Sequence, residues 1–302
     1  MKKMLVVVVA SAAAALSFAA FAQQRNFDAV QIKTTKVADG IYMLEGEGGN
    51  IGVSAGEDGV FLIDDQFAPL TPKIVAAVKT ISDKPIRFLM NTHWHGDHVG
   101  GNENLGKAGV VIIAHDNVYK RMSVGGAITM LKQNYAPYPK VALPTVSFSQ
   151  SASFHLNGDD VTSTHLPPAH TDGDSFVRFA KANVVHTGDV FASYRYPFID
   201  PESGGSVKGV LRAVDQLLLV IDDKTKVIPG HGGLSSRKDV LAYRKMIATA
   251  ISKIEPMAKS GRTLQQVIDA KPLREFDEEW GKFRKPEAFV EIVYSGLKPA
   301  KK

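Results

Sequence analysis

Residues 91–98 of this chain read Asn-Thr-His-Trp-His-Gly-Asp-His. This stretch places three imidazoles and a carboxylate within six residues, which is far denser than chance for a chain of 302 residues with 9 histidines. It follows residues 86–90, an apolar run typical of a buried strand. Alternate residues of an extended loop share one side, and a turn redirects the residues that follow. Positions 93 and 95 are therefore expected to converge on one point and positions 97 and 98 on another, which predicts two adjacent metal sites.

Three further polar side chains stand where other strand-like runs give way to glycine-containing loops. His170 follows residues 161–165, Asp189 follows residues 184–186, and His231 follows residues 226–228. Loops at one edge of a sheet are held by rigid strands, and glycine lets the backbone approach a metal closely. We therefore expect these side chains to complete the metal ligands. Imidazole nitrogen and carboxylate oxygen without sulfur suit Zn(II) first, with Fe or Mn as competitors.

Composition excludes several other classes of protein. The chain is 44% hydrophobic and 22% charged, as is usual for one or two globular domains. It contains no cysteine, which excludes a disulfide scaffold, a thiolate zinc site and a cysteine nucleophile. Dispersed serines such as Ser149 and Ser151 do not stand in the G-x-S-x-G elbow of serine hydrolases, so covalent catalysis is not expected. The formal net charge of +5 is small and scattered, so nucleic acid is not an expected partner.

The first 22 residues have the pattern of a secretory signal peptide. Lys2 and Lys3 precede an uncharged, mostly apolar run over residues 4–21, which ends in a small-x-small sequence with cleavage expected after Ala22. An uncleaved anchor is the alternative, because this run is near the shortest length that spans a bilayer. The sequence thus predicts a periplasmic or secreted protein, with no stable membrane insertion after cleavage. Loss of the two lysines would reduce the net charge to +3.

Short strand-like runs occur in two groups, and helical segments follow each group. The first group comprises residues 30–36, 41–44, 51–54, 60–63, 86–90 and 110–114, and the second comprises residues 146–148, 153–156, 161–165, 176–179, 184–186 and 226–228. Helices are predicted from Thr71 as the N-cap, over residues 116–122 and 207–221, and from about residue 235 to a stop at Pro256. This order predicts an α+β fold in which two β/α halves pack sheet against sheet with helices outside.

The pattern predicts a single domain over residues 23–302. Its core is expected at about residues 41–235, and the C-terminal helices at residues 235–302. Residues 123–144 contain several glycines and prolines and show no clean period. They are expected to form a surface excursion and not a separate module.

Four motifs together resemble the full ligand set of the metallo-β-lactamase superfamily, in the same order along the chain. They are HxHxDH at 93–98, His170 in a loop with Gly and Thr, TGD at 187–189 and PGHG at 229–232. The resemblance extends from about residue 41 to residue 231. It implies an αβ/βα four-layer sandwich, with two mixed sheets face to face, and two Zn²⁺ ions per chain.

Carried over to this sequence, the resemblance assigns a role to each ligand. One zinc would be held by His93, His95 and His170, and the other by Asp97, His98 and His231. Asp189 would bridge or cap the pair. Asp64, at the end of the strand-like run 60–63, matches the acidic residue that supports this site from beneath.

Two close divalent ions would lower the pKa of a shared water and give a bridging hydroxide nucleophile, which Asp97 would orient. The resulting prediction is an exported dinuclear zinc hydrolase that opens a cyclic amide in a small-molecule substrate, as a β-lactamase does. The alternatives are a lactonase, a thioesterase, a sulfatase-like enzyme or another ester hydrolase with glyoxalase II-like chemistry. Two further alternatives are a di-iron redox protein, which would carry Glu in place of His95, and a binding domain without catalysis. No oligomeric state follows from the sequence.

Loop residues beside the ligands are candidates for the substrate pocket. These are Phe67, Trp94, Tyr194 and Arg195, and further aromatic candidates are Tyr135, Tyr138 and Tyr196. The turn at residues 46–50 resembles the hairpin that covers substrate in the β-lactamases of this superfamily. The remaining histidines are expected to be structural or surface residues, with His186 the candidate exception because it neighbours Asp189: they are His115, His155, His165 and His186.

Two departures from the best-known β-lactamases affect the substrate. Asp189 stands where those enzymes have a cysteine, and Ala192 stands where they have a lysine that binds the substrate carboxylate. Arg195 is a candidate replacement for that lysine. An aspartate at the bridging position resembles glyoxalase II, lactonases and other hydrolases of the superfamily.

Overall fold

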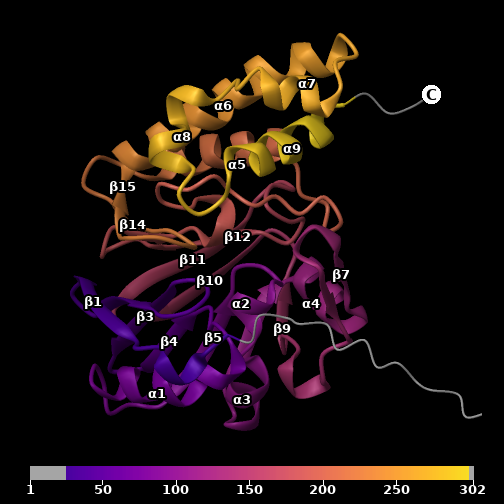
Figure 1. Ribbon diagram of the computed structural model, residues 1–302. Helices are drawn as coiled ribbons and strands as arrows, with labels where there is room; N and C mark the ends of the chain where they lie inside the picture. Colours follow the sequence, from indigo (N-terminus) through magenta and orange to yellow (C-terminus); the bar gives the residue numbers. More distant parts are fainter. Residues whose placement is uncertain (1–24, 299–302) are drawn as a thin grey trace, which may run out of the picture.

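The computed structural model describes residues 25–298, which form two large β-sheets packed face to face with helices on their outer sides (Figure 1). The first sheet has seven strands in the order β1-β2-β3-β4-β5-β6-β9. They are β1 (Lys33–Ala38), β2 (Ile41–Glu45), β3 (Ile51–Gly56), β4 (Gly59–Ile63), β5 (Ile86–Asn91), β6 (Val111–His115) and β9 (Val146–Phe148). Strands β1 to β4 form an antiparallel meander, whereas β5, β6 and β9 are added in parallel.

The second sheet has six strands in the order β10-β11-β12-β13-β14-β15. They are β10 (Ser151–Leu156), β11 (Asp159–His165), β12 (Ser175–Phe179), β13 (Val184–His186), β14 (Lys226–Ile228) and β15 (Ser235–Ser236). Only the pairing of β13 with β14 is parallel. Both sheets are thus mixed, which confirms the predicted α+β class.

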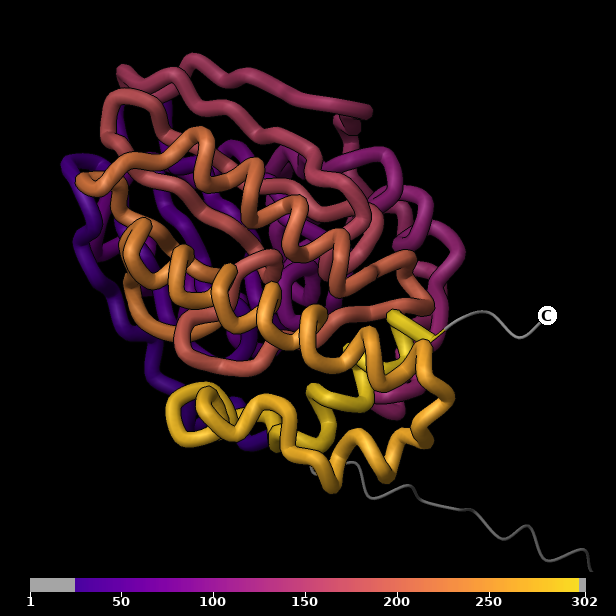
Figure 2. Tube along the Cα trace, turned by 90° about the horizontal axis from the view of Figure 1, so that it is seen from above, coloured from indigo at the N-terminus to yellow at the C-terminus, as the bar shows by residue number. Residues whose placement is uncertain are grey.

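Three apolar layers hold the sandwich together. Between the sheets, Ile63 and Met90 of the first sheet pack in one cluster with Val177 and Val184 of the second. The outer face of the first sheet is covered by α1 (Thr71–Lys79) and α3 (Asn102–Lys107). The outer face of the second is covered by α5 (Val207–Val220), α6 (Arg237–Lys259) and α9 (Pro286–Leu297). Figure 2 shows these last helices lying across that sheet. The predicted order of helices, sheet, sheet and helices is therefore confirmed.

Two predicted helix ends were wrong. Helix α1 begins at Thr71 with Leu70 as its N-cap, because a 3-10 turn, Ala68–Leu70, runs directly into it. Helix α6 does not stop at Pro256 but continues through it to Lys259. A proline inside a helix removes one backbone hydrogen bond. Burial of Ile254 and Ala258 on either side of the proline stabilises this last turn.

The irregular segment at residues 123–144 is anchored to the rest of the protein. After α4 (Asp116–Val124), it forms a small hairpin of β7 (Gly126–Ile128) and β8 (Gln133–Tyr135). Ile128 is buried, and the Tyr135 ring lies 5.5 Å from that of Trp94. The excursion therefore has a fixed position, beside the loop that carries the histidine motif.

The C-terminal part adds α7 (Leu264–Asp269) and α8 (Arg274–Trp280) before α9, and the short helix α2 (Gly96–Val99) lies in the histidine motif itself. Trp280 packs into the same cluster as α5 and α6. Within residues 25–298, no helix is both long and apolar enough to cross a membrane. The predicted signal peptide, residues 1–22, lies outside the described residues, and the single domain over residues 23–302 stays a prediction.

Candidate metal centre

Seven predicted ligand residues come together where strands of both sheets end. The loop after β5 and helix α2 carry four of them, and single residues follow β11, β13 and β14. Three groups of ligand atoms each lie within 4.8 Å of one another. These groups are His93, His95 and His170; His93, His98 and Asp189; and Asp97, His98 and His231. The first and third match the two predicted ligand sets, and Asp189 lies between them.

Several buried ligand atoms make no hydrogen bond among the described residues. His93 Nε2, His98 Nε2 and Asp189 Oδ1 are buried without a hydrogen bond. His98 Nε2 and Asp189 Oδ1 lie 3.1 Å apart but are not aligned for one. Buried polar atoms are normally paired, so a cluster of unpaired ligand atoms needs another partner. Imidazole nitrogens and carboxylate oxygens in this arrangement fit divalent metal ions.

Asp64 lies beneath the centre and orients its ligands, as the sequence predicts. Its Oδ2 is 2.7 Å from His98 Nδ1, which directs the other ring nitrogen inward. The same carboxylate accepts hydrogen bonds from the backbone N–H and the hydroxyl of Thr92, both at 2.8 Å. The Thr92 hydroxyl in turn lies 3.1 Å from His93 Nδ1. One fully buried carboxylate thus supports two ligands.

Asp200 is a second support, and sequence analysis missed it. Its Oδ2 lies 3.0 Å from His95 Nε2, and its Oδ1 accepts hydrogen bonds from the backbone of Glu202 and Ser203. An aspartate before Pro201 is a common turn residue, so its sequence context gives no other signal. His170 is held similarly, because its Nδ1 lies 2.8 Å from the carbonyl oxygen of Phe198.

The charges around the centre are unequal. Burial, together with the neighbouring imidazoles, lowers the pKa of His93 well below its usual value and that of His170 to about 4. Burial also opposes charge on His98 and His231, but there the nearby carboxylates prevail. The pKa of His231 rises to about 9, chiefly through Asp189. Without metal, the surroundings thus disfavour a positive charge on His93 and His170 and favour one on His98 and His231.

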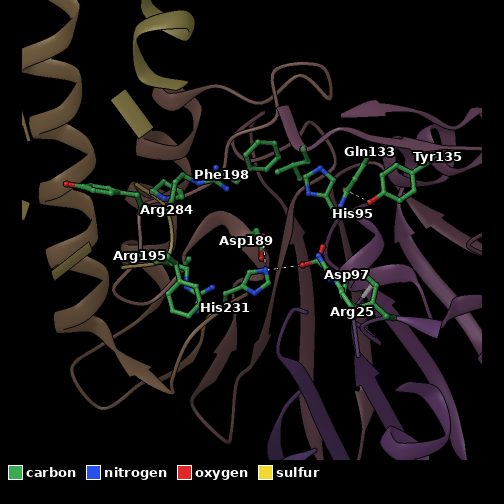
Figure 3. A pocket seen from close by; sticks show the side chains of 16 residues that line it. Arg25, His95, Asp97, Gln133, Tyr135, Asp189, Arg195, Phe198, His231 and Arg284 are labelled. Atoms are coloured by element: carbon green, nitrogen blue, oxygen red, sulfur yellow. Dashed lines mark hydrogen bonds and ion pairs between the residues drawn. The ribbon is translucent and has the colours of Figure 1, made fainter. Parts of the chain in front are cut away.

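A cavity of about 250 Å³ opens onto the ligands (Figure 3). Phe67 and Arg195 line it, as predicted from the sequence, and so do Tyr135 and Tyr196. In the view of Figure 3, Gln133 and Tyr135 lie on the side opposite Arg195 and Arg284, with Asp189 and His231 between. Access to the ligands is therefore bounded by the β7–β8 hairpin on one side and by C-terminal segments on the other.

Two predicted pocket residues do not line this cavity. Trp94 is buried behind the ligand loop, where its Nε1 donates to the Ser203 hydroxyl at 2.9 Å. Alternation explains this position, because the residue between two inward-facing ligands must face outward. Tyr194 adopts a positive φ of 49° and donates its hydroxyl to Asp239 of α6. Both expectations were wrong.

The remaining histidines lie outside the ligand groups. His186 is buried, with Nε2 3.0 Å from the carbonyl oxygen of Asn50. His155 is exposed and faces Asp160, while the rings of His115 and His165 stack at 3.6 Å. They occupy structural or surface positions, as predicted.

Hydrogen bonds hold the turn at residues 46–50 beside the ligand residues. The Gly49 N–H donates to the Asp97 carbonyl, and its own carbonyl accepts from Gln66 Nε2 at 2.7 Å. A Cβ at Gly49 would come within 2.2 Å of His98 Cε1. Glycine is thus required here for close approach to a ligand.

Comparison with known proteins gives one family and several relatives. The family model for the metallo-beta-lactamase superfamily matches residues 44–231. An uncharacterized protein of Mycobacterium tuberculosis is 38% identical over 82 residues, which are 26% of this chain and 36% of that protein. The linear primary-alkylsulfatase of a Pseudomonas species is 33% identical over 90 residues, covering 26% of this chain and 17% of that enzyme. The matched part of this chain therefore covers 36% of the length of the first relative and 17% of the length of the second.

Two solved structures share the fold. A metallo-beta-lactamase from Pontibacter korlensis superposes with a TM-score of 0.59 at 16% identity, over 72% of this chain and 99% of that one. The sec-alkylsulfatase Pisa1 from a Pseudomonas species gives a TM-score of 0.67 at 18% identity, over 89% of this chain and 52% of that one. At these identities the likeness is one of fold.

Proposed function

The chain belongs to the metallo-beta-lactamase superfamily, and from this membership we propose that it is a hydrolase that uses two divalent ions, with zinc preferred. The observation that carries the proposal is the set of converging, buried ligand atoms that make no hydrogen bond among the described residues, which includes His93 Nε2 and His98 Nε2. We propose a cyclic amide of the β-lactam kind as the first substrate class to test.

The ligand groups assign the residues that would hold each ion. His93, His95 and His170 would hold one, and Asp97, His98 and His231 would hold the other, with Asp189 between them. When bound, such ions supply Lewis acidity, which polarises a scissile carbonyl and makes water acidic enough to act as a nucleophile near neutral pH.

The residues facing the cavity would position the nucleophile and the substrate. Asp97 Oδ2 lies 3.3 Å from His231 Nε2, and positive neighbours lower the pKa of this carboxyl despite its burial, so it would orient water as an acceptor. Burial raises the pKa of Tyr135 to about 12, so its hydroxyl stays a donor at neutral pH. Phe67 and Phe198 give the cavity apolar walls that exclude water.

Ester hydrolysis is the second candidate, with lactones, thioesters and sulfate esters as substrate classes. One observation favours it: Ala192 lines the cavity at the position where β-lactamases of this superfamily carry the lysine for the lactam carboxylate. The local sequence match to a linear primary-alkylsulfatase adds support for a sulfate ester.

The test combines metal analysis with a substrate panel. The purified chain would be assayed for metal content and for hydrolysis of a chromogenic β-lactam, a lactone, a thioester and an aryl sulfate, each with and without chelator. We expect two zinc ions per chain and chelator-sensitive turnover. His93→Ala should abolish both, whereas His155→Ala, which alters an exposed histidine, should change neither.

Each outcome separates the candidates. Opening of the β-lactam supports the first, and turnover of esters alone supports the second. A chain that binds no divalent ion, or hydrolyses every substrate equally well with chelator, would refute a metal-dependent hydrolase. Bound iron without hydrolysis would favour the redox alternative.

We also propose that the protein is exported and that residues 1–22 are removed. The support is the pattern of Lys2 and Lys3 before an apolar run that ends at Ala22. N-terminal sequencing of the protein recovered outside the cytoplasm should start at Gln23. Recovery of an intact N-terminus in the membrane fraction would favour an anchor.

A further inference from the structure

Two arginines line the metal cavity without a partner. Arg195 follows the 3-10 turn that carries Asp189, and Arg284 lies in the turn between α8 and α9. In Figure 3, both lie on the side of the cavity opposite Tyr135. The Nε atom of each is buried and has no hydrogen-bond partner among residues 25–298. Each arginine is partly buried, and its buried N–H has no acceptor in the described part of the chain.

Four other arginines of the described residues, including Arg121 and Arg237, form ion pairs with carboxylates. Arg121 lies 2.6 Å from an oxygen of Asp172, and Arg237 lies 3.3 Å from one of Asp223. Burial alone lowers the pKa of Arg284, and no carboxylate opposes it. For Arg195, the only opposing carboxylate is Asp189, a candidate metal ligand whose charge bound metal would neutralise. Buried cations normally have an anionic partner.

Aromatic rings fix the orientation of both guanidinium groups. Arg195 Cζ lies 3.7 Å from the centre of the Phe283 ring, and Arg284 Cζ lies 5.1 Å from that of Phe198. A guanidinium over an aromatic face keeps the N–H groups along its edge free to donate. Such an edge is a planar fork that matches an oxyanion, so each arginine offers the cavity a group that can bind an anion.

We propose that Arg195 and Arg284 form a subsite for an anionic group of the substrate, a carboxylate or a sulfate, beside an apolar portion held by Phe198 and Phe283. This inference rests on the proposed hydrolase function and defines its substrate class. The turn between α8 and α9 lies outside residues 44–231, which the family model matches. The C-terminal helices thus do more than cover a sheet, because they supply part of the wall that selects the substrate.

The test measures binding and not turnover. Hexane-1-sulfonate, an anion with an apolar chain and no hydrolysable bond, would be titrated calorimetrically into the purified protein with its metal content recorded. Arg195→Ala and Arg284→Ala should each weaken its binding about tenfold or more, and Arg284→Lys should lose less than Arg284→Ala. Arg262→Ala changes an exposed arginine of the same helical region and should bind like the unaltered chain.

Two comparisons make the result specific. Hexan-1-ol, which lacks the charge, should bind equally to all variants, and hexanoate in place of the sulfonate distinguishes a carboxylate site from a sulfate site. The proposal is overturned if neither anion binds the unaltered chain at millimolar concentration, or if both alanine variants bind as the unaltered chain does. Equal loss of hexan-1-ol binding would also overturn it, because the wall would then have collapsed.

Failure of this inference and failure of the proposed function are distinguishable. Chelator-sensitive hydrolysis with arginine-independent anion binding would leave the hydrolase in place and remove the subsite. Arginine-dependent binding in a chain that hydrolyses nothing would keep the anion subsite and remove the hydrolase. Once a substrate is known, Arg284→Ala should raise KM about tenfold or more with little change in kcat, since the arginine binds a group remote from the scissile bond.

Discussion

The floor and the rim of the cavity are built differently. The floor consists of the seven ligand residues with Asp64 and Asp200 beneath them, and its parts are fixed at strand ends by buried carboxylates. The rim consists of the β7–β8 hairpin with its connecting turn and the turn between α8 and α9, where Leu131 is 38% exposed and Phe283 is 74% exposed. A rigid floor suits chemistry that needs accurate placement, whereas an exposed rim can change without loss of the core. Changes in the floor should therefore affect the reaction, and changes in the rim should affect substrate binding.

The largest effect is expected from removing a floor ligand. His95→Ala or His231→Ala should reduce turnover about a thousandfold or more, because each takes a nitrogen from one ligand group. Circular dichroism should show that the fold is retained. Turnover near that of the unaltered chain in either variant would sink the two-metal mechanism.

A smaller effect is expected from a support residue. Asp200→Asn should weaken metal binding about 10- to 100-fold, because His95 loses the carboxylate that orients its ring. Competition with a chromophoric chelator measures this affinity. Asp160→Asn is the matched control, because Asp160 pairs with the exposed His155 in the same way. This variant should leave metal binding unchanged. Equal metal affinity in the two variants would mean that Asp200 does not support the floor.

In the turn at residues 46–50, Gly49 should not tolerate replacement by a residue that has a Cβ. Gly49→Ala brings a methyl group against the His98 ring and should cost about 1–3 kcal/mol of stability, with weaker metal binding. Gly233→Ala adds its Cβ in open space and serves as the control. Thermal unfolding of both variants checks this prediction, and a Gly49→Ala protein as stable as the control would contradict it.

A rim substitution should leave the metals in place. Tyr135→Phe removes the hydroxyl that donates to Gln133 at 2.6 Å but keeps the ring against Trp94. Metal content and kcat should stay within about twofold, while KM changes by less than about tenfold, the range of one neutral hydrogen bond. Loss of metal from this variant would place Tyr135 with the floor.

The smallest effect is expected for His115 and His165, whose rings stack on each other. Burial lowers the pKa of both His115 and His165, so protonation favours the unfolded chain. The stability they contribute is present above their unfolded pKa of about 6.5 and is lost as the pH falls below it. His165→Gln should reduce the fall in Tm between pH 7.5 and 5.5 by less than about 3 °C, since His165 is only partly buried. An unchanged pH profile would show that the pair does not titrate on unfolding.

The floor could be predicted from the sequence because its signal is local. Three of its histidines lie within six residues, and the others follow strand-like runs that end at the same edge. The sequence offered Tyr135 as a pocket candidate, but the arrangement of the rim could not be predicted, since residues 123–144 have no period and Arg284 lies 89 positions after Arg195. Their meeting depends on how the C-terminal helices pack, which no short pattern encodes.

Two other errors concern Trp94 and Pro256. Proximity in sequence placed Trp94 in the pocket, but the alternation of the extended loop turned it to the opposite side. Pro256 was expected to end a helix by its local preference, but burial of the neighbouring turn outweighed that preference. Local alternation decided the first case and tertiary packing decided the second.

The ligand groups also join the two halves of the sandwich. His93 follows a strand of the first sheet, whereas His170 and His231 follow strands of the second. Ions held by all three would act as cross-links between the sheets, and such binding adds about 2.7 kcal/mol to stability at a free metal concentration 100 times the Kd. The resistance of this protein to proteolysis would then depend on the free metal concentration around it. A shortage of metal would lower the amount of intact protein as well as its activity.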